Sequence, residues 1–368
     1  MADTAMISLA GVTKVFPGSD APAVDRLTLD VAEGEVIVLV GPSGCGKTTT
    51  LKMINRLIEP TGGRITVAGD DVTAVPAHEL RRRIGYVIQQ IGLFPHRTIG
   101  DNIATVPRLL GWDKRRIAAR VAELIELVDL EDGMQHRYPA ELSGGQRQRV
   151  GVARALAADP PVMLMDEPFG AVDPIVRARL QDEFLGLQAR LHKTIVLVTH
   201  DIDEAIKMGD RVAILNVGGV LEQYDAPFRI LAEPANPFVE DFLGSDRGIK
   251  RLSLISIRDV ELEPGPVVAA TASVAEARAA MDRYGVAWVG IGGDDGSLGW
   301  VWGDDLAAEG TLADMEPRPF RIRLSGDDSL REALDTVIST HAKVAPVFDG
   351  DRFLGVLTAE GISREIVQ

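Results

Sequence analysis

Residues 41–48 read Gly-Pro-Ser-Gly-Cys-Gly-Lys-Thr, which completes the pattern Gly-x4-Gly-Lys-Thr of a phosphate-binding loop. The apolar run Val36–Val40 precedes this loop, and a segment compatible with a helix, Thr49–Ile58, follows it. A strand that ends in a glycine-rich turn and opens a helix brings backbone N–H groups together around phosphate oxygens. In such a loop Lys47 supplies positive charge and Thr48 a magnesium ligand. The sequence therefore predicts a nucleoside triphosphate site.

The composition limits the classes of protein to which the chain can belong. Its 368 residues are long for one core, so two or three domains are expected. With 46% hydrophobic and 25% charged residues the composition is that of an ordinary folded protein, and no apolar stretch reaches the roughly 18 residues that span a bilayer. The first residues lack the basic and apolar regions of a signal peptide, so we expect the protein in the cytosol. The net charge of −15 argues against nucleic acid as a partner, because phosphate contacts need a basic face.

Apolar patterns divide the first two thirds of the chain into three kinds of segment. Alternation at period two predicts an antiparallel sheet from Ile7–Phe16, Ala23–Val31 and Gly63–Val72. Continuous apolar runs separated by helical patterns predict a parallel sheet with crossover helices from Glu35–Val40, Ile84–Gln89, Val162–Asp166 and Ile195–Thr199. Between Thr98 and Pro160 the pattern is helical almost throughout, which indicates a helical subdomain inserted between two strands of the parallel sheet.

The last third contains an internal repeat with an offset of 56 residues. At this offset Ser273–Ala277 aligns with Ser329–Ala333, Leu298 with Leu354, and Leu306 with Ile362. Each copy is expected to run strand, helix, strand, strand, helix. Repeats of this length complete each other's core, so the two copies are predicted to form one paired unit. The composition of residues 244–248 is that of a linker before this unit.

Charged and polar residues follow the predicted buried strands and open a predicted helix. Asp166 and Glu167 end the run that begins at Val162, where Asp166 can hold magnesium and Glu167 can deprotonate water. His200 ends another apolar strand, a position suited to contact with a γ-phosphate. Ser143 and the two glycines after it precede a helical segment, and a helix N-terminus is an anion site. These residues add catalytic and phosphate-binding groups to the loop.

Together the motifs resemble those of ATP-binding cassette (ABC) ATPases, over roughly residues 5–243. The resemblance implies a RecA-like α/β core with an antiparallel β subdomain and a helical subdomain, and ATP and Mg²⁺ as cofactors. It assigns catalysis to Glu167, His200 and Gln89, and magnesium to Thr48, Gln89 and Asp166. It assigns nucleotide binding to Phe16, Gly41, Ser43, Gly44, Cys45, Gly46, Lys47, Thr48, Thr49, Ser143, Gly144, Gly145, Gln146 and Asp173. Phe16 would stack on adenine, although a place in the core is an equal alternative.

The family implies partners as well as ligands. Two cassettes bind head to tail, because the signature residues 143–146 of one subunit complete the phosphate site of the other. The stretches Leu80–His96 and Lys52–Pro60 are similar to those of bacterial importer subunits for glycine betaine, carnitine, choline or proline betaine. Integral-membrane permease subunits and, indirectly, an extracytoplasmic solute-binding protein would then be partners, with this chain at the cytoplasmic face of the membrane. Rival interpretations are a cassette for another small solute, such as an amino acid, and an ABC ATPase not coupled to transport.

Such importer subunits commonly end in tandem cystathionine-β-synthase (CBS) domains, which agrees with the repeat. The resulting division is 1–244 for the ATPase, 245–256 for a linker, 257–306 for the first CBS repeat and 307–368 for the second, each of the form βαββα. Adenosine-binding CBS repeats carry Gly-h-h-Ser/Thr-x-x-Asp, where h is apolar. The copy Gly299–Asp305 keeps the aspartate but has Trp302 in place of the hydroxyl, and Gly355–Gly361 does the reverse. A regulatory role and a purely dimer-stabilising role both remain open for this acidic unit.

Overall fold

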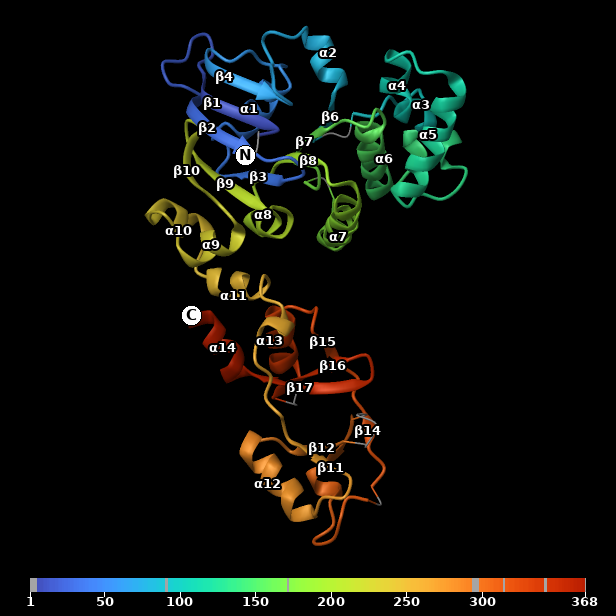
Figure 1. Cartoon of the computed structure of the whole chain (residues 1–368), viewed down its shortest axis with the longest axis vertical. Helices are drawn as coiled ribbons and strands as arrows, with labels where there is room; N and C mark the ends of the chain where they lie inside the picture. Colours follow the sequence, from blue (N-terminus) through green and yellow to red (C-terminus); the bar gives the residue numbers. More distant parts are fainter. Residues whose placement is uncertain are drawn as a thin grey trace. The chain divides into compact units, whose positions relative to one another are not determined.

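The computed structural model describes residues 5–89, 92–170, 172–292, 298–313, 315–340 and 343–367. The chain divides into two compact units, Met1–Leu243 and Gly244–Gln368, drawn from blue to yellow and from yellow to red in Figure 1.

A six-stranded sheet forms the centre of the N-terminal unit. Its strand order is β10-β9-β3-β8-β7-β6, and all pairs are parallel except β9 with β10. The bounds are β3 Val36–Val40, β6 Ile84–Val87, β7 Val162–Asp166, β8 Thr194–Val198, β9 Arg211–Asn216 and β10 Val220–Asp225. Every residue of β3, β7 and β8 is buried, as expected for strands covered on both faces. The predicted parallel sheet with crossover helices is confirmed.

A second sheet packs against the first through a shared core. It is antiparallel, with the order β2-β1-β4-β5, and its strands are β1 Ile7–Lys14, β2 Val24–Val31, β4 Gly62–Val67 and β5 Asp70–Asp71. Alternate residues of β2 face inward, as the period-two pattern predicts. Leu9, Leu29 and Ile65 join the central strands in one apolar cluster that fixes the position of the loop after β3.

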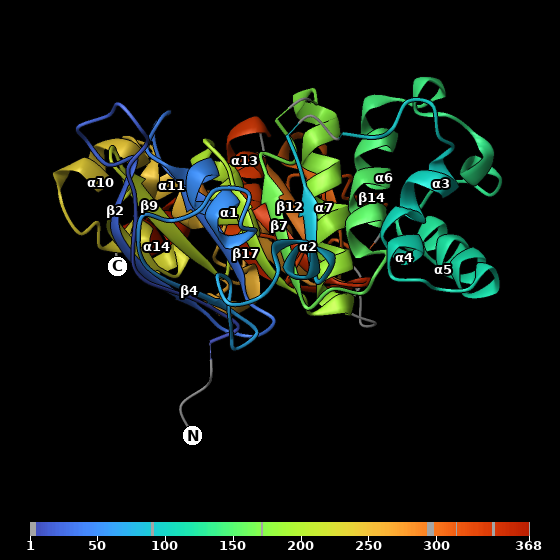
Figure 2. The ribbon, with the colours of Figure 1, turned by 90° about the horizontal axis from the view of Figure 1, so that it is seen from above.

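Helices surround the sheets and form the predicted helical subdomain. The crossover and edge helices are α1 Lys47–Ile54, α2 Ala77–Arg82, α7 Pro174–Leu191, α8 Ile202–Met208, α9 Pro227–Ala232 and α10 Pro237–Leu243. The subdomain consists of α3 Ile99–Ile103, α4 Thr105–Leu109, α5 Lys114–Leu127, η1 Met134–His136, η2 Pro139–Glu141 and α6 Gly144–Leu156. In Figure 2 α3, α4 and α5 lie together beyond α6, on the side away from β2 and β4.

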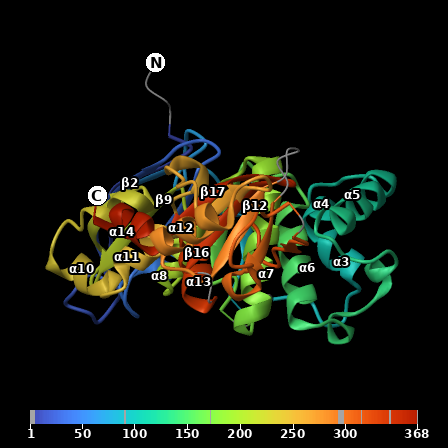
Figure 3. The same cartoon turned by 90° about the horizontal axis from the view of Figure 1, so that it is seen from below.

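The C-terminal unit contains the predicted pair of repeats. The first copy has β11 Val267–Ala269, α12 Val274–Tyr284, β12 Trp288–Gly292, β13 Leu298–Trp302, η4 Gly303–Asp305 and β14 Arg318–Pro319. The second has β15 Leu324–Ser325, α13 Leu330–Ser339, β16 Val344–Asp349, β17 Arg352–Thr358 and α14 Ala359–Val367. The helices at Val274 and Leu330 and the strands at Trp288 and Val344 start 56 residues apart, which matches the sequence repeat. Figure 3 gives a view of these elements from below.

The first copy departs from the expected order at its end. Where the second copy forms α14, the first forms only the short 3-10 turn η4. Gly303 and Gly310 bound this segment, and each glycine costs a helix about 1 kcal/mol relative to alanine. The chain instead continues to β14, which pairs with β13.

The stretch 245–256, expected as a linker in the domain division, contains the helix α11 Arg247–Leu252. Leu252 is fully buried in the core that the second repeat forms around Leu330 and Val347. After it comes the 3-10 turn η3 Ile257–Asp259, whose Ile257 is buried in the same core. The second half of this stretch therefore belongs to the C-terminal unit as part of its packing.

Candidate functional site

The glycines of the loop after β3 allow the chain to pass very close to neighbouring backbone. A Cβ atom at Gly41 would lie 2.1 Å from the carbonyl oxygen of Leu215, and one at Gly46 would lie 2.4 Å from that of Ala23. Both glycines also have positive φ, 153° and 99°. Only glycine fits these two positions. The loop geometry thus follows from contact with other strands as well as from the eight residues themselves.

Lys47 begins α1 and turns back over the loop. Its Nζ donates hydrogen bonds to the carbonyl oxygens of Gly41, at 2.8 Å, and Pro42, at 3.0 Å. Beside it lies a hollow of about 450 Å³ lined by Ala23, Ser43, Gly44, Gly46, Lys47, Thr48, Thr49, Glu167 and His200. The backbone N–H groups at the start of α1 and the ammonium group make this hollow suited to phosphate. The side chain of Cys45 is fully buried beneath the loop.

Thr48 and Asp166 bring a hydroxyl and a carboxylate together at the edge of this hollow. Thr48 Oγ1 donates to Asp166 Oδ1 at 2.9 Å. Burial raises the pKa of Asp166, and the hydrogen bond from Thr48 opposes that shift. Burial, together with the charge of Asp166, raises the pKa of Tyr86 to about 12. Hard oxygen donors of this kind suit Mg²⁺, which takes few protein ligands and the rest from phosphate and water. Among the described residues no three His, Cys, Asp or Glu side chains gather as a metal cluster.

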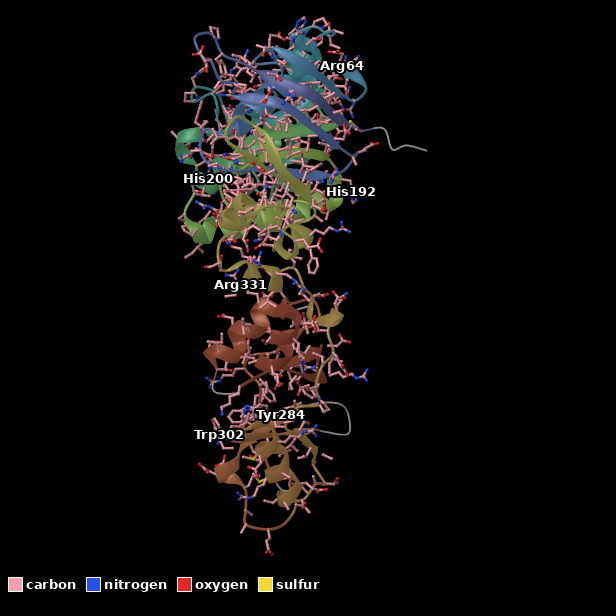
Figure 4. All side chains as sticks on the ribbon, turned by 90° about the vertical axis from the view of Figure 1, so that its left-hand side faces the viewer. Arg64, His192, His200, Tyr284, Trp302 and Arg331 are labelled. Carbon is pink, nitrogen blue, oxygen red and sulfur yellow. The ribbon has the colours of Figure 1, made fainter. Side chains whose placement is uncertain are left out.

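Two of the residues predicted to act in catalysis, Gln89 and His200, contact the carboxylate of the third, Glu167. Gln89 Nε2 donates to Glu167 Oε2 at 2.7 Å, and His200 Nδ1 lies 3.2 Å from Glu167 Oε1. Glu167 itself has a positive φ of 46°, and its N–H donates to the carbonyl oxygen of Val198 at 2.9 Å. This backbone turn at the end of β7 directs the carboxylate toward the phosphate loop. His200 is labelled among the side chains of this unit in Figure 4.

The predicted signature residues line a different hollow, of about 560 Å³, together with Asp173. Ser143 caps α6, and its Oγ accepts a hydrogen bond from the N–H of Gln146 at 3.3 Å, while the Gln146 side chain accepts from the N–H of Ser143 at 2.9 Å. Asp173 caps α7 and accepts from the N–H of Val176 at 3.0 Å. No residue of the loop 41–48 lines this hollow. Within one chain the signature and the phosphate loop are therefore separate.

Phe16 lies on the surface of the unit. Its side chain is 39% exposed, and Lys14 Nζ lies 5.2 Å from the centroid of its ring. A place in the core is therefore excluded. Phe16 does not line the hollow at the phosphate loop, so its contact with adenine stays a prediction.

The sequence interpretation missed a buried group behind His200. Glu204 is 6% exposed, and one of its oxygens accepts a hydrogen bond from Thr199 Oγ1 at 2.6 Å. Thr199 Oγ1 in turn accepts from the N–H of Asp201 at 3.1 Å, so Glu204 anchors the residues on both sides of His200. Burial raises the pKa of Glu204. The sequence offers a single signal for Glu204. The residue lies on the same side of α8 as Ala205 and Met208, which are buried.

The comparisons with known proteins agree with this geometry. The family model described as ABC transporter matches residues 24–170, and the CBS domain model matches residues 314–368. The Osmoprotectant import ATP-binding protein OsmV of Salmonella typhimurium is 48% identical over 97% of this chain and 95% of its own length. The Choline transport ATP-binding protein OpuBA of Bacillus subtilis is 46% identical, over 96% of this chain and 94% of its own length.

A further relative and a solved structure match a smaller share of the chain. The Glycine betaine/carnitine/choline transport ATP-binding protein OpuCA of Bacillus subtilis is 57% identical over 67% of this chain and 64% of its own length. The dimeric, post-hydrolysis structure of the ATP-binding cassette MJ0796 bound to ADP and Pi superposes with a TM-score of 0.54 and 33% identity, over 60% of this chain and 99% of that one. In the described part of this chain, no helix has both the length and the apolar character needed to cross a membrane. Because relatives that are 46% and 48% identical match almost end to end, the chain belongs to the ABC transporter family, as an ATP-binding protein with C-terminal CBS repeats.

Proposed function

We propose that this chain is the ATP-hydrolysing subunit of an importer for quaternary-amine osmoprotectants. The observation that carries the proposal is the similarity to OsmV at 48% identity over 97% of the chain, CBS repeats included. The relatives are named for osmoprotectant, choline, and glycine betaine, carnitine and choline transport. Glycine betaine, carnitine and choline share a quaternary ammonium group, which defines the substrate class. The chain would act at the cytoplasmic face of the membrane, bound to permease subunits.

Glu167 is the proposed general base. It lines the hollow beside the phosphate loop, and its two oxygens are each held by a different side chain, Gln89 and His200. A carboxylate fixed in this way can accept a proton from a water aligned with the γ-phosphate, which general-base catalysis requires. His200 would hold the γ-phosphate, and Gln89 would link the carboxylate to the metal site.

Lys47 and the backbone N–H groups of residues 43–49 would bind the phosphates of ATP. Thr48 and Asp166, with Gln89, would hold Mg²⁺, and their hydrogen-bonded oxygens fit that role. When bound, the metal neutralises charge on the β- and γ-phosphates. Phe16 would contribute an aromatic face to the adenine.

A second copy of the chain would complete the site. Ser143 to Gln146 form the N-terminal end of α6 and line a polar hollow that contains no residue of the loop 41–48. A head-to-tail dimer would bring this helix end to the partner's γ-phosphate, and Asp173 would join it there. The unit Met1–Leu243 would then serve as the ATPase and the unit Gly244–Gln368 as the regulatory part.

Uptake into proteoliposomes tests this function. The chain would be purified with the permease that binds it, and uptake of radiolabelled glycine betaine measured with ATP inside or outside the vesicles. We expect uptake that depends on ATP on the side of this chain and that excess choline or carnitine inhibits. Uptake inhibited by histidine but not by quaternary amines would assign another solute class, and the lack of any bound permease would contradict a role in transport.

A further inference from the structure

The C-terminal unit contains an aromatic hollow of about 640 Å³ between its two repeats. Three of the four tryptophans of the chain line it, Trp288, Trp300 and Trp302, together with Phe320. The wall on the other side comes from α13 and β16 of the second repeat. The nucleotide site of the N-terminal unit makes no use of this hollow.

The aromatic rings are arranged at right angles to one another. The centroids of Trp300 and Trp302 lie 4.9 Å apart with an interplanar angle of 89°, and those of Trp288 and Phe320 lie 5.4 Å apart at 75°. Trp300 Nε1 donates to the carbonyl oxygen of Pro319 at 3.3 Å, which fixes its ring. Trp302 is 36% exposed, so the hollow is open to solvent at this ring (labelled in Figure 4). Perpendicular indole rings present π-faces and edges to one small volume, as in aromatic cages for cations.

The charges around the hollow favour a zwitterion. Among the described residues no carboxylate lines it, whereas Arg318 and Arg321 both do. The Arg318 guanidinium lies over the Trp300 ring, 5.6 Å from its centroid, and 3.4 Å from Asp305. No ion pair joins Arg321 to a carboxylate of the described residues. A cation bound here would therefore be held by aromatic faces, and an attached anionic group would be attracted by Arg321.

The lining also selects among cations. A primary ammonium carries three N–H groups that need acceptors when they leave water. Among the described side chains that line the hollow, only the two hydroxyls of Thr336 and Thr340 can accept a hydrogen bond, fewer than three N–H groups require. A quaternary ammonium has no N–H to satisfy, and its methyl groups pack on the indoles.

Two features speak against an adenosine ligand. Trp302 stands where the adenosine pattern has a hydroxyl, so the first repeat lacks the hydroxyl that would help to bind phosphate. Asp305, the aspartate that would bind ribose, pairs with Arg318 and does not line the hollow.

We propose that this hollow binds a zwitterionic quaternary amine, with the ammonium against Trp300 and Trp302 and the carboxylate at Arg321. The choice of the imported osmolyte as the ligand rests on the proposed function. Because an importer raises the concentration of its substrate in the cytoplasm, a site of millimolar affinity reports how much has been taken up. The ligand contacts both repeats, so its binding changes how they pack and limits further uptake.

Tryptophan fluorescence and titration calorimetry on the full-length chain test the proposal. Glycine betaine, which adds no ionic strength, should bind saturably, and tetramethylammonium chloride should bind more weakly at matched salt. Trp302→Ala should weaken the binding of glycine betaine at least about tenfold, and Trp302→Phe should retain most of the affinity. Arg321→Ala should weaken the binding of glycine betaine but not that of tetramethylammonium. The matched control is Trp112→Ala, which should bind glycine betaine normally. Trp112, the remaining tryptophan, lies in the N-terminal unit, where the Arg116 guanidinium lies 3.6 Å from the centroid of its ring.

Two results would overturn the inference. One is a glycine betaine titration that is the same in Trp302→Ala and in the unaltered chain, with circular dichroism showing that both are folded. The other is displacement of glycine betaine by ATP or ADP in the Lys47→Ala background, which would make the hollow a nucleotide site. Uptake in proteoliposomes separates this inference from the proposed function. If quaternary amines are transported but do not bind at Trp302, only the proposal for the hollow is rejected. If glycine betaine binds but is not transported, only the proposed substrate class is rejected.

Discussion

The hollow at the phosphate loop and the aromatic hollow of the C-terminal unit are built in opposite ways. The first is lined mainly by one short loop and the ends of two strands, and its shape depends on glycines pressed against Leu215 and Ala23. The second is lined by side chains that lie between residues 288 and 346, and aromatic rings make up much of its wall. Phosphate is bound by backbone N–H groups with fixed geometry, whereas a soft cation is bound by ring faces. The first kind of site leaves a motif in the sequence, and the second leaves none.

The largest effect is expected where one side chain carries the chemistry. Glu167→Gln keeps an acceptor for Gln89 but cannot take a proton, so steady-state ATP hydrolysis by the transporter complex should fall about 10²- to 10⁴-fold while ATP binding persists. Glu123→Gln, at an exposed ion pair with Arg120, is the control. Hydrolysis near the unaltered level in Glu167→Gln would remove the general base from the account. No single substitution in the aromatic hollow should approach this effect.

The next largest effect tests whether the signature acts on a second copy. Ser143→Arg should leave ATP affinity of the monomer unchanged and prevent the ATP-dependent dimer, measured by gel filtration in the Glu167→Gln background. The control is Ser273→Arg, because Ser273 caps α12 with the same pair of hydrogen bonds that Ser143 makes at α6. Loss of such a cap costs about 1 kcal/mol of local stability. At α12 this loss should not affect nucleotide binding. If Ser143→Arg weakened ATP binding to the monomer as strongly as Lys47→Ala, the separation of the two hollows would have no functional meaning.

A smaller effect, of about two- to fivefold, is expected from removing the C-terminal unit. Residues 249–368 carry 12 Lys and Arg against 20 Asp and Glu, and salt shortens the screening length from about 30 Å at 0.01 M to about 8 Å at 0.15 M. Like-charged units should then approach more easily as salt rises, so the transport-coupled ATPase of a chain cut after Gly244 should respond less to salt. The cut lies before α11 because Leu252 is part of the C-terminal core. Identical salt curves for the two complexes would leave this unit with a structural role in the dimer.

The smallest effect concerns the buried carboxyl group behind His200. Since burial raises the pKa of Glu204 above its ordinary value of 4.5, the folded state holds this proton more tightly than the unfolded state does, and stability falls as the pH rises above 4.5. Glu204→Gln should therefore gain a few degrees in melting temperature relative to the unaltered chain at pH 8, and less at pH 5, in thermal unfolding experiments. A constant difference across this range would show that the charge of Glu204 is not the cause.

The parts of the candidate N-terminal site are short and local, so the sequence is enough to place them at the ends of strands and helices. The loop 41–48, the acidic pair at the end of β7 and the signature before α6 each sit at a strand or helix end that the apolar pattern also predicts. The meeting of Gln89 and His200 at Glu167 is different. It joins three strand ends that lie up to 111 residues apart, so it follows from the order of strands in the sheet and cannot be obtained from spacing.

The differences in the C-terminal unit have local and tertiary causes. The first repeat forms only η4 where the second forms α14, although the repeat predicts a helix in both copies. The helix α11 is stabilised by the burial of Leu252, which depends on packing and not on composition. The aromatic hollow could not be predicted, because Trp288 and Trp302 meet only through the register of β12 with β13, and the opposite wall comes from the second repeat.

The most direct test of the two-site account is a crossed binding measurement on one preparation of full-length chain. Titration calorimetry with Mg²⁺-ATP and with glycine betaine would be carried out on the Lys47→Ala and Trp302→Ala variants. The account predicts that Lys47→Ala loses ATP binding and keeps glycine betaine binding, and that Trp302→Ala does the opposite. Loss of ATP binding in Trp302→Ala, or glycine betaine binding that is unaffected by either substitution, would contradict it.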